Sequence, residues 1–408
     1  MKILHTSDWH LGQKFSHFDR KEEHRLALDW LLDLVENEKV DVLLVSGDVF
    51  DLGSPPSYAE EQYYRFLAEL SRTSCRHVVI TAGNHDSPAH LEAPRRLLQA
   101  LNVHVRVRSG EDELLVLQDR QGRAEAVVAA VPFLRDRDLG AGLAAESPEE
   151  RIMRLRQRIK EHYQHLGQRA ELYAEHNLPI IAMGHLYARG SQVADPRRQQ
   201  NIYLGDEKNI AVSDFPDIFQ YVALGHLHRA QAVEGNSRVQ YSGSIIPLSF
   251  RETIDEKSVT LTFWKGGHLL ESKRFRLPVF RRLKTLRGGS PAILLEKMEA
   301  FAKRHESDRL RPWLELVLQA DYMEPALRLR LQEAAQRLEM DVLSLRLEQT
   351  QKSDWTADKP QKSLEQLRPE EVFEERCRQE HLPKGEIEKL RQTFEELLEW
   401  MQQKGEEL

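Results

Sequence analysis

The chain begins Met1-Lys2-Ile3-Leu4-His5-Thr6-Ser7-Asp8-Trp9-His10, a short apolar run that ends in a carboxylate and an imidazole two residues apart. If Ile3 to Thr6 form a strand, Asp8 and His10 lie in the loop just past its carboxyl end. Ligands bind at that edge of open α/β sheets, because the strand ends converge there. A polar surface loop can also contain Asp-x-His, so the assignment depends on whether other strand ends carry matching side chains.

Four further apolar runs end in the same way, each in a glycine followed by Asp, Asn or His. The runs 40–46, 77–81, 180–183 and 221–224 lead into Gly47-Asp48-Val49-Phe50-Asp51, Gly83-Asn84-His85-Asp86, Gly184-His185 and Gly225-His226-Leu227-His228. Glycine permits the tight turn and close backbone approach that bring several strand ends together. The alternative is a set of separate loop residues satisfied by local hydrogen bonds, but five such clusters in one chain favour a shared metal site.

The candidate ligands are carboxylates, an amide and imidazoles, and none is a thiolate. This set suits Mn²⁺, Mg²⁺ or iron and argues against a structural zinc site. Seven ligands suffice for two ions that share one bridging carboxylate. Two ions about 3.5–4 Å apart clamp the attacking and leaving oxygens of an in-line displacement, as in phosphatases and nucleases. The pattern therefore predicts hydrolysis of a phosphate ester.

The first two thirds of the chain alternate strand and helix patterns, whereas 237–241, 258–264 and 268–277 are typical of antiparallel strands, the last two joined at Gly266-Gly267. We therefore expect an α/β fold with two packed mixed β-sheets flanked by helices. The helices expected near the ligand loops are 57–72 and 88–101.

The pattern changes after Leu277-Pro278, and we expect four segments. They are a large domain with the ligand clusters at 1–277, a small α/β domain at 278–348, a polar linker at 349–362 and a helical region at 363–408. The last helix carries an apolar stripe from Ile387 to Met401. Such a stripe behind a linker favours docking on a partner helix, and packing on the parent domain is the alternative.

The composition excludes several classes of protein. No apolar run approaches the roughly 20 residues that span a bilayer, and we expect no signal peptide before the first strand. Two cysteines among 408 residues exclude a disulfide framework and favour a cytoplasmic location. With a net charge of −7, any contact with nucleic acid depends on a local basic patch or on a partner.

The five ligand clusters, in this order, resemble the calcineurin-like metallophosphoesterase family. Longer stretches narrow the resemblance to the SbcD family, the nuclease subunits of bacterial SbcCD complexes and counterparts of the eukaryotic Mre-type nuclease. These stretches are HTSDWHLGQ (5–13), SGDVFDLGSPPSYA (46–59), AGNHDS (82–87), ALGHLHRAQ (223–231) and GSIIPLSF (243–250). The first domain then corresponds to the nuclease domain, and the small second domain to a DNA-capping domain.

The resemblance implies a role for each candidate residue. One metal ion would be held by Asp8, His10 and His228, the other by Asn84, His185 and His226, with Asp48 as the bridge. His85 would orient the phosphate and protonate the leaving 3′-oxygen; the alternative for His85 is a hydrogen-bonding role beside the ligands. Asp51 and Asp86 would orient the ligand imidazoles.

The resemblance also implies two Mn²⁺ ions, although the ligand set would equally accept Mg²⁺. It implies an ATP-dependent double-strand exonuclease and a single-strand or hairpin endonuclease for DNA repair, recombination and replication. The implied partner is SbcC, the coiled-coil ATPase subunit, bound by the helical region at 363–408, and the implied assembly is a homodimer within a heterotetramer. The alternatives are a phosphatase or small-molecule phosphodiesterase on the same site, and a non-catalytic subunit that tethers DNA ends.

Two basic stretches could contact DNA phosphates without regard to sequence. Near the domain junction the candidates are Arg281, Arg282, Lys284 and Arg287, for which we favour DNA. For the basic helix face at 151–160, a solvated surface is at least as good an interpretation. The helices at 57–72 and 88–101 are the candidates for a homodimer contact, although the apolar residues of the first suit an ordinary core equally well.

Overall fold

The computed structural model describes residues 1–348 except 16, 111–112, 141–146, 194–208, 306–308, 321, 323 and 325, together with 390, 391, 393 and 394. Its contacts divide the chain into Met1–Thr350 and Gln351–Leu408. The predicted linker at 349–362 and nearly all of the predicted helical region at 363–408 lie outside the described residues. In the part that is described, no helix combines the length and the apolar character that crossing a membrane requires.

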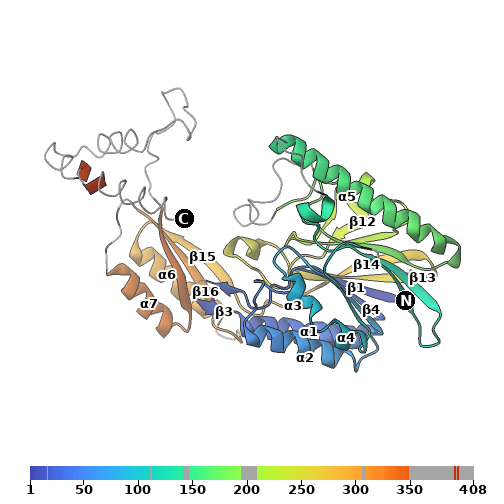
Figure 1. Cartoon of the computed structure of the whole chain (residues 1–408). Coiled ribbons are helices and arrows are strands. Elements are labelled where there is room, and N and C mark those ends of the chain that lie inside the picture. Colours follow the sequence, from blue (N-terminus) through green and yellow to red (C-terminus); the bar gives the residue numbers. More distant parts are fainter. Residues whose placement is uncertain are drawn as a thin grey trace. The chain divides into compact units, whose positions relative to one another are not determined.

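Two six-stranded mixed sheets form the body of Met1–Thr350 (Figure 1). The first has the order β14-β13-β1-β4-β5-β6. Its strands are β1 (Lys2–Thr6), β4 (Val42–Ser46), β5 (His77–Thr81), β6 (Val103–Arg106), β13 (Ser258–Lys265) and β14 (His268–Arg276). Strands β1, β4, β5 and β6 are parallel, whereas β13 and β14 are antiparallel to their neighbours.

The second sheet has the order β11-β12-β10-β9-β8-β7. Its strands are β7 (Leu114–Gln118), β8 (Ala124–Ala130), β9 (Ile180–His185), β10 (Tyr221–Gly225), β11 (Gln231–Val233) and β12 (Asn236–Tyr241). The expectation that 237–241 is antiparallel is wrong on one side, because β12 runs parallel to β10 and antiparallel only to β11. The predicted pair of packed mixed sheets is confirmed.

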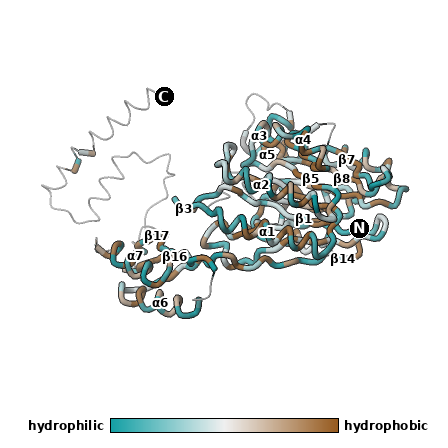
Figure 2. Tube along the Cα trace, turned by 90° about the horizontal axis from the view of Figure 1, so that it is seen from below, coloured by the Kyte–Doolittle hydropathy of each residue, from teal (hydrophilic) through white to brown (hydrophobic). Residues whose placement is uncertain are grey.

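The alternation of side chains along each strand builds a four-layer structure. On β1, Ile3 faces the second sheet and packs in a core with Val128, Ile181 and Met183, whereas Leu4 faces outward. Figure 2 shows the hydrophobic residues concentrated along central strands such as β1 and β5. The outer face of the first sheet packs on helices α1 (Lys21–Glu38) and α2 (Ser57–Leu70), and that of the second packs on α5 (Pro148–Ala170).

Of the two helices proposed for a homodimer contact, one agrees with its alternative interpretation as core and the other is divided, and the contact itself stays a prediction. The apolar residues of α2 are core, since Tyr63, Phe66, Leu67 and Leu70 are each at most 1% exposed. The predicted helix at 88–101 is two short helices, α3 (Pro88–Glu92) and α4 (Arg95–Gln99), with Pro94 between them. Proline lacks the backbone N–H that a continuous helix needs at that position.

The segment predicted as a small α/β domain contains a three-stranded parallel sheet with its own hydrophobic core. Its elements are β15 (Leu283–Gly288), α6 (Pro291–Arg304), β16 (Trp313–Gln319), α7 (Leu327–Arg337) and β17 (Asp341–Glu348). A two-stranded hairpin, β2 (Lys14–Phe15) and β3 (Phe18–Asp19), follows the first ligand loop and packs on this domain through contacts of Phe15 and Phe18 with Trp313.

Glycine is required where the ligand loops of the two sheets meet. A Cβ atom on Gly225, at the end of β10, would lie 1.8 Å from the Ser46 carbonyl oxygen at the end of β4. A Cβ atom on Gly83 would lie 2.1 Å from Asp48 Oδ1. The predicted close approach of the strand ends is therefore present, and both neighbours are parts of other ligand loops.

We expect Gly225→Ala to destabilise the fold by about 3 kcal/mol, because the new methyl group must displace a neighbouring backbone. The measurement is urea unfolding followed by circular dichroism. Gly110→Ala is the matched control, since a Cβ atom there meets nothing within 4 Å. Equal free energies of unfolding for the two variants would show that the ligand loops can move apart without loss of stability.

Candidate metal centre

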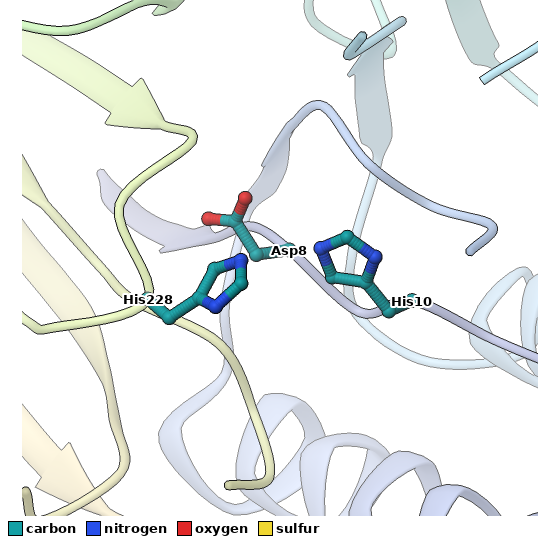
Figure 3. A group of neighbouring side chains, drawn as sticks. All are labelled: Asp8, His10 and His228. Carbon is teal, nitrogen blue, oxygen red and sulfur yellow. The ribbon is translucent and has the colours of Figure 1, made fainter. Parts of the chain in front are cut away.

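The structure brings together side chains from all five strand ends. Three of the predicted ligands, Asp8 and His10 after β1 and His228 after β10, have ligand atoms within 4.8 Å of one another. Figure 3 shows the Asp8 carboxylate beside the imidazole of His228, with the His10 imidazole on the other side of Asp8. The strands β1 and β10 belong to different sheets, so this group forms across the sandwich rather than between paired strands.

A second group lies beside the first. Asp48, His185 and His226 have ligand atoms within 4.8 Å of one another. The amide oxygen of Asn84 lies 3.1 Å from His185 Nε2 and 3.1 Å from His226 Nδ1. The four side chains thus direct two oxygens and two nitrogens at one point, as a divalent ion requires.

Asp48 lies between the two groups. Its Oδ2 atom is 3.2 Å from His185 Nε2 and 3.5 Å from His10 Nε2. Its other oxygen, Oδ1, accepts a hydrogen bond of 2.9 Å from the backbone N–H of His85. One carboxylate oxygen is therefore within reach of both groups, which is the geometry of a bridging ligand.

The imidazoles are oriented by hydrogen bonds on the ring edge away from the site. His185 Nδ1 donates to the Ser46 carbonyl at 2.9 Å, and His10 Nδ1 donates to Asp51 Oδ1 at 3.2 Å. These bonds leave Nε2 of each ring directed at the site. Among the described residues, the buried His10 Nε2 atom has no hydrogen-bond partner. A buried nitrogen lone pair without a donor fits a metal ligand.

The backbone of the ligand loops is strained. Asp8, His10, Asp48 and His226 have φ values of 51°, 47°, 50° and 98°. Residues other than glycine adopt this left-handed region rarely, and such residues cluster at functional sites where the surrounding structure enforces them. The strain is the local consequence of turning four side chains toward a common point.

The electrostatics favour a cation at this place. Burial alone would lower the pKa of His185, but the charge and hydrogen bond of Asp48 outweigh it and raise the pKa to about 9. A divalent ion would supply the positive charge that the Asp48 carboxylate attracts, and the His185 ring would then be neutral. Burial, helped by the neighbouring His185, lowers the pKa of His226 to about 3, so this ring is neutral, as a ligand must be.

The two carboxylates expected to orient imidazoles have different partners. Asp51 contacts the His10 ring as predicted. Asp86 does not bind an imidazole among the described residues; its carboxylate accepts hydrogen bonds from the backbone N–H groups of Val49, Phe50 and Gly83. Burial first, and then the Asp48 charge, raise the pKa of Asp86 to about 6. Asp86 therefore joins two ligand loops through their backbones.

His85 is the exposed histidine of the site. Its Nδ1 atom donates to the Asp51 carbonyl at 2.9 Å, and its ring centre lies 4.8 Å from that of His10. The hydrogen bond fixes the ring and leaves Nε2 for a substrate. His85, Asp51 and His10 also form a third group of ligand atoms within 4.8 Å of one another.

The arginines proposed to contact DNA have mixed surroundings. Arg281 is largely buried, forms an ion pair of 2.9 Å with Glu23 and lies over the Trp313 ring, so its charge joins the two domains. Arg287 pairs with Glu348 at 3.1 Å on the surface. Lys284 is exposed and Arg282 is half-buried. Their contact with DNA stays a prediction.

The basic face of α5 is neutralised by acidic neighbours. Its cations form ion pairs with Asp136, Asp214 and Glu161; the cations are Arg151, Arg154, Arg156, Arg158 and Lys160. This pattern favours the solvated helix face over a DNA-binding surface.

One residue of the site, Glu252, was not predicted from the sequence. Fully buried in the 3₁₀ helix Phe250–Ile254, it accepts a hydrogen bond of 3.0 Å from His228 Nδ1. Its other oxygen accepts from Lys257 Nζ at 2.8 Å and from the Leu248 N–H at 3.0 Å. Burial opposes ionisation, but Lys257 and then His228 lower the pKa of Glu252 well below its usual value. No spacing pattern points to Glu252, because its partner lies on another loop.

We expect Glu252→Gln to weaken the binding of one metal ion about 10–100-fold, because the ring of His228 loses its charged acceptor. The measurement is Mn²⁺ titration followed by electron paramagnetic resonance of the free ion. Glu271→Gln, an exposed position on β14, is the control. Two unchanged Mn²⁺ affinities in Glu252→Gln would show that this carboxylate only supports the fold.

Comparisons with known proteins agree with this geometry. Residues 1–230 match the family model of the calcineurin-like phosphoesterases, and residues 279–381 match that of the type 5 capsule protein repressor C-terminal domain. The SbcD subunit of the nuclease SbcCD of Escherichia coli K12 is 37% identical over 97% of each chain. The corresponding subunit of Rhodobacter capsulatus is 36% identical over 91% of this chain and 93% of its own. That of Bacillus subtilis is 33% identical over 65% and 67%.

Proposed function

Because the chain belongs to the calcineurin-like phosphoesterase family and, within it, to the SbcD nuclease subunits, we propose that it hydrolyses DNA phosphodiesters at a two-metal centre. The observation that carries this proposal is the position of Asp48, whose Oδ2 atom lies within 3.5 Å of a histidine from each ligand group. A single ion would not need a carboxylate shared in this way.

We assign one ion to Asp8, His10 and His228 and the other to Asn84, His185 and His226, with Asp48 common to both. When bound, such a pair of divalent ions acts as a Lewis acid and activates water near neutral pH. The donors are imidazole nitrogens and amide or carboxylate oxygens, and we propose Mn²⁺ as the ion, with Mg²⁺ as the alternative that the same donors accept.

The chain's own residues position the phosphate and move one proton. His85 is exposed at the centre, and its Nδ1 atom is occupied by the Asp51 carbonyl. We propose that Nε2 contacts a phosphate oxygen and delivers the proton to the leaving 3′-oxygen. Asp51 orients both His10, through its side chain, and His85, through its backbone.

The names of the relatives place them in a complex called SbcCD, of which they are the SbcD component. We propose that this chain likewise works with SbcC, the coiled-coil ATPase subunit, as a homodimer within a heterotetramer. On this proposal the complex is an ATP-dependent double-strand exonuclease and hairpin endonuclease in the cytoplasm. The region expected to bind SbcC, 363–408, lies almost wholly outside the described residues.

The test is cleavage of linear duplex and hairpin DNA by the chain, with and without SbcC and ATP, across Mn²⁺, Mg²⁺ and chelator. We expect cleavage with Mn²⁺ and none with chelator. A chain that hydrolyses phosphoprotein or cyclic nucleotides but no DNA would instead be a phosphatase or small-molecule phosphodiesterase. A chain that hydrolyses none of these but bridges DNA ends with SbcC would be a tethering subunit.

A further inference from the structure

A groove of about 640 Å³ opens beside the loop that carries His228. Charged side chains dominate its walls, three of them cations and two of them carboxylates. These are Arg229, Arg274, Arg276, Asp255 and Glu256. Arg229 directly follows His228 in the chain, so one wall of the groove continues from a ligand loop.

The strand register places the groove at the same end of the sheets as the metal centre. β13 is antiparallel to β1 and pairs Thr260 with His5, close to the end of β1. β14 in turn pairs Arg274 with Thr260 and Arg276 with Ser258. Both arginines therefore lie level with the loop that begins at the end of β1. Since paired strands are about 4.8 Å apart, β14 lies about 10 Å from β1.

The three arginines differ in how far their charge is already satisfied. Arg229 donates to Gln192 Oε1 and pairs with Asp255, both at 2.8 Å, so it holds the wall together. Arg276 is 72% exposed and pairs at 2.9 Å with Glu256, which is 64% exposed. An exposed ion pair of this kind contributes little to stability, so a phosphate can readily replace the carboxylate.

Of the three arginines that line the groove, Arg274 has the positive charge that is least compensated by neighbouring carboxylates. Its Nη1 atom donates to the Ala230 carbonyl at 3.3 Å. Among the described residues, no carboxylate lies within ion-pair distance of its guanidinium group. An exposed guanidinium with spare N–H groups, held by a backbone carbonyl next to a ligand loop, matches the geometry of a phosphate contact.

Protection of an exposed sheet edge is the competing explanation, because charges on an edge strand prevent pairing with another chain. It does not account for the distribution of the charges along β14. The half of β14 that is distant from the centre carries Leu270, an apolar side chain that is 64% exposed. The cations Lys273, Arg274 and Arg276 gather in the half that is level with the metal centre.

We propose that this groove binds the phosphate backbone of the DNA strand next to the cleaved bond, with Arg274 and Arg276 as the phosphate contacts. The inference rests on the proposed function and names where its substrate lies. The spacing of about 10 Å between β14 and β1 equals the length of about three nucleotides at 3.4 Å of rise per nucleotide. Binding in the groove is independent of sequence, because the contacts reach only phosphates.

The test uses the full chain carrying Arg274→Gln and Arg276→Gln together. We expect the KM for an oligonucleotide of ten nucleotides to rise about tenfold. The plot of log affinity against log salt concentration should become less steep, by the amount that about two phosphate contacts contribute. Hydrolysis of bis(p-nitrophenyl) phosphate and of a dinucleotide should not change, because neither substrate reaches the groove.

Arg120→Gln with Arg123→Gln is the matched control, since both residues are exposed and lie in the β7–β8 turn at the opposite end of the second sheet. If wild type cleaves DNA and the groove variant equals this control in KM and salt slope, the groove proposal is wrong and the proposed function stands. If wild type neither binds nor cleaves DNA, both the proposed function and the groove proposal are wrong.

Discussion

Asp48→Asn is expected to lower the rate of DNA hydrolysis about a thousandfold, because it removes the negative charge shared by the two metal ions. Asparagine has the shape of aspartate and can keep the hydrogen bond that Oδ1 accepts from the His85 N–H. The fold should therefore survive while the site loses its bridge. The measurement is kcat on hairpin DNA together with metal content per chain by mass spectrometry, which should fall below two ions.

Asp41→Asn is the control for this charge change. Asp41 immediately precedes β4, at the end of the strand opposite Asp48, where it accepts hydrogen bonds from the Lys2 N–H and from Arg76. Its loss should leave kcat and metal content unchanged even if some stability is lost. An Asp48→Asn chain that retains two ions and wild-type kcat would show that the two groups do not share this carboxylate.

His85→Ala is the other substitution with a large expected effect, a fall in kcat on DNA of about 10²–10⁴-fold with both ions still bound. The side chain is exposed and belongs to neither of the two proposed ligand sets, so its removal should leave metal affinity unchanged. Hydrolysis of bis(p-nitrophenyl) phosphate should fall much less, because p-nitrophenolate leaves without a proton. The difference between the two substrates separates proton delivery from a general loss of the site.

His268→Ala is the control for His85→Ala, since His268 is an exposed histidine at the end of β14 away from the centre. Equal losses on DNA and on the activated diester would mean that His85 positions the phosphate but delivers no proton. Wild-type cleavage of hairpin DNA by His85→Ala would remove this residue from the mechanism altogether.

The layered fold was predictable because its signals are local. The apolar run 40–46 is buried along the whole of β4, and the glycines at 266 and 267 turn β13 into β14. The one helix expected at 88–101 is interrupted at Pro94, because proline lacks the backbone N–H that a continuous helix needs there. Secondary structure follows such short-range patterns, so most of it could be read in advance.

The partners of each side chain were much less predictable. The Glu252 carboxylate beside His228 and the backbone contacts of Asp86 come from different loops, and no spacing pattern connects them. The arginines near the domain junction looked alike in sequence, yet Arg281 is largely buried in a pair with Glu23, whereas Arg287 is on the surface. Burial depends on what packs on a residue, and that is a property of the assembled domain.

The opening segment, Met1 to His10, shows which features follow from the sequence and which follow from the tertiary structure. By itself, the sequence determined that β1 ends in Asp8 and His10 and that four other strands end in a glycine and a polar ligand, because these are patterns of neighbouring residues. Only the tertiary structure decided that His228 reaches Asp8 from the opposite sheet and that Asp48 lies between two groups. Those positions depend on strand order and on sheet packing across more than 200 residues, which local spacing does not encode.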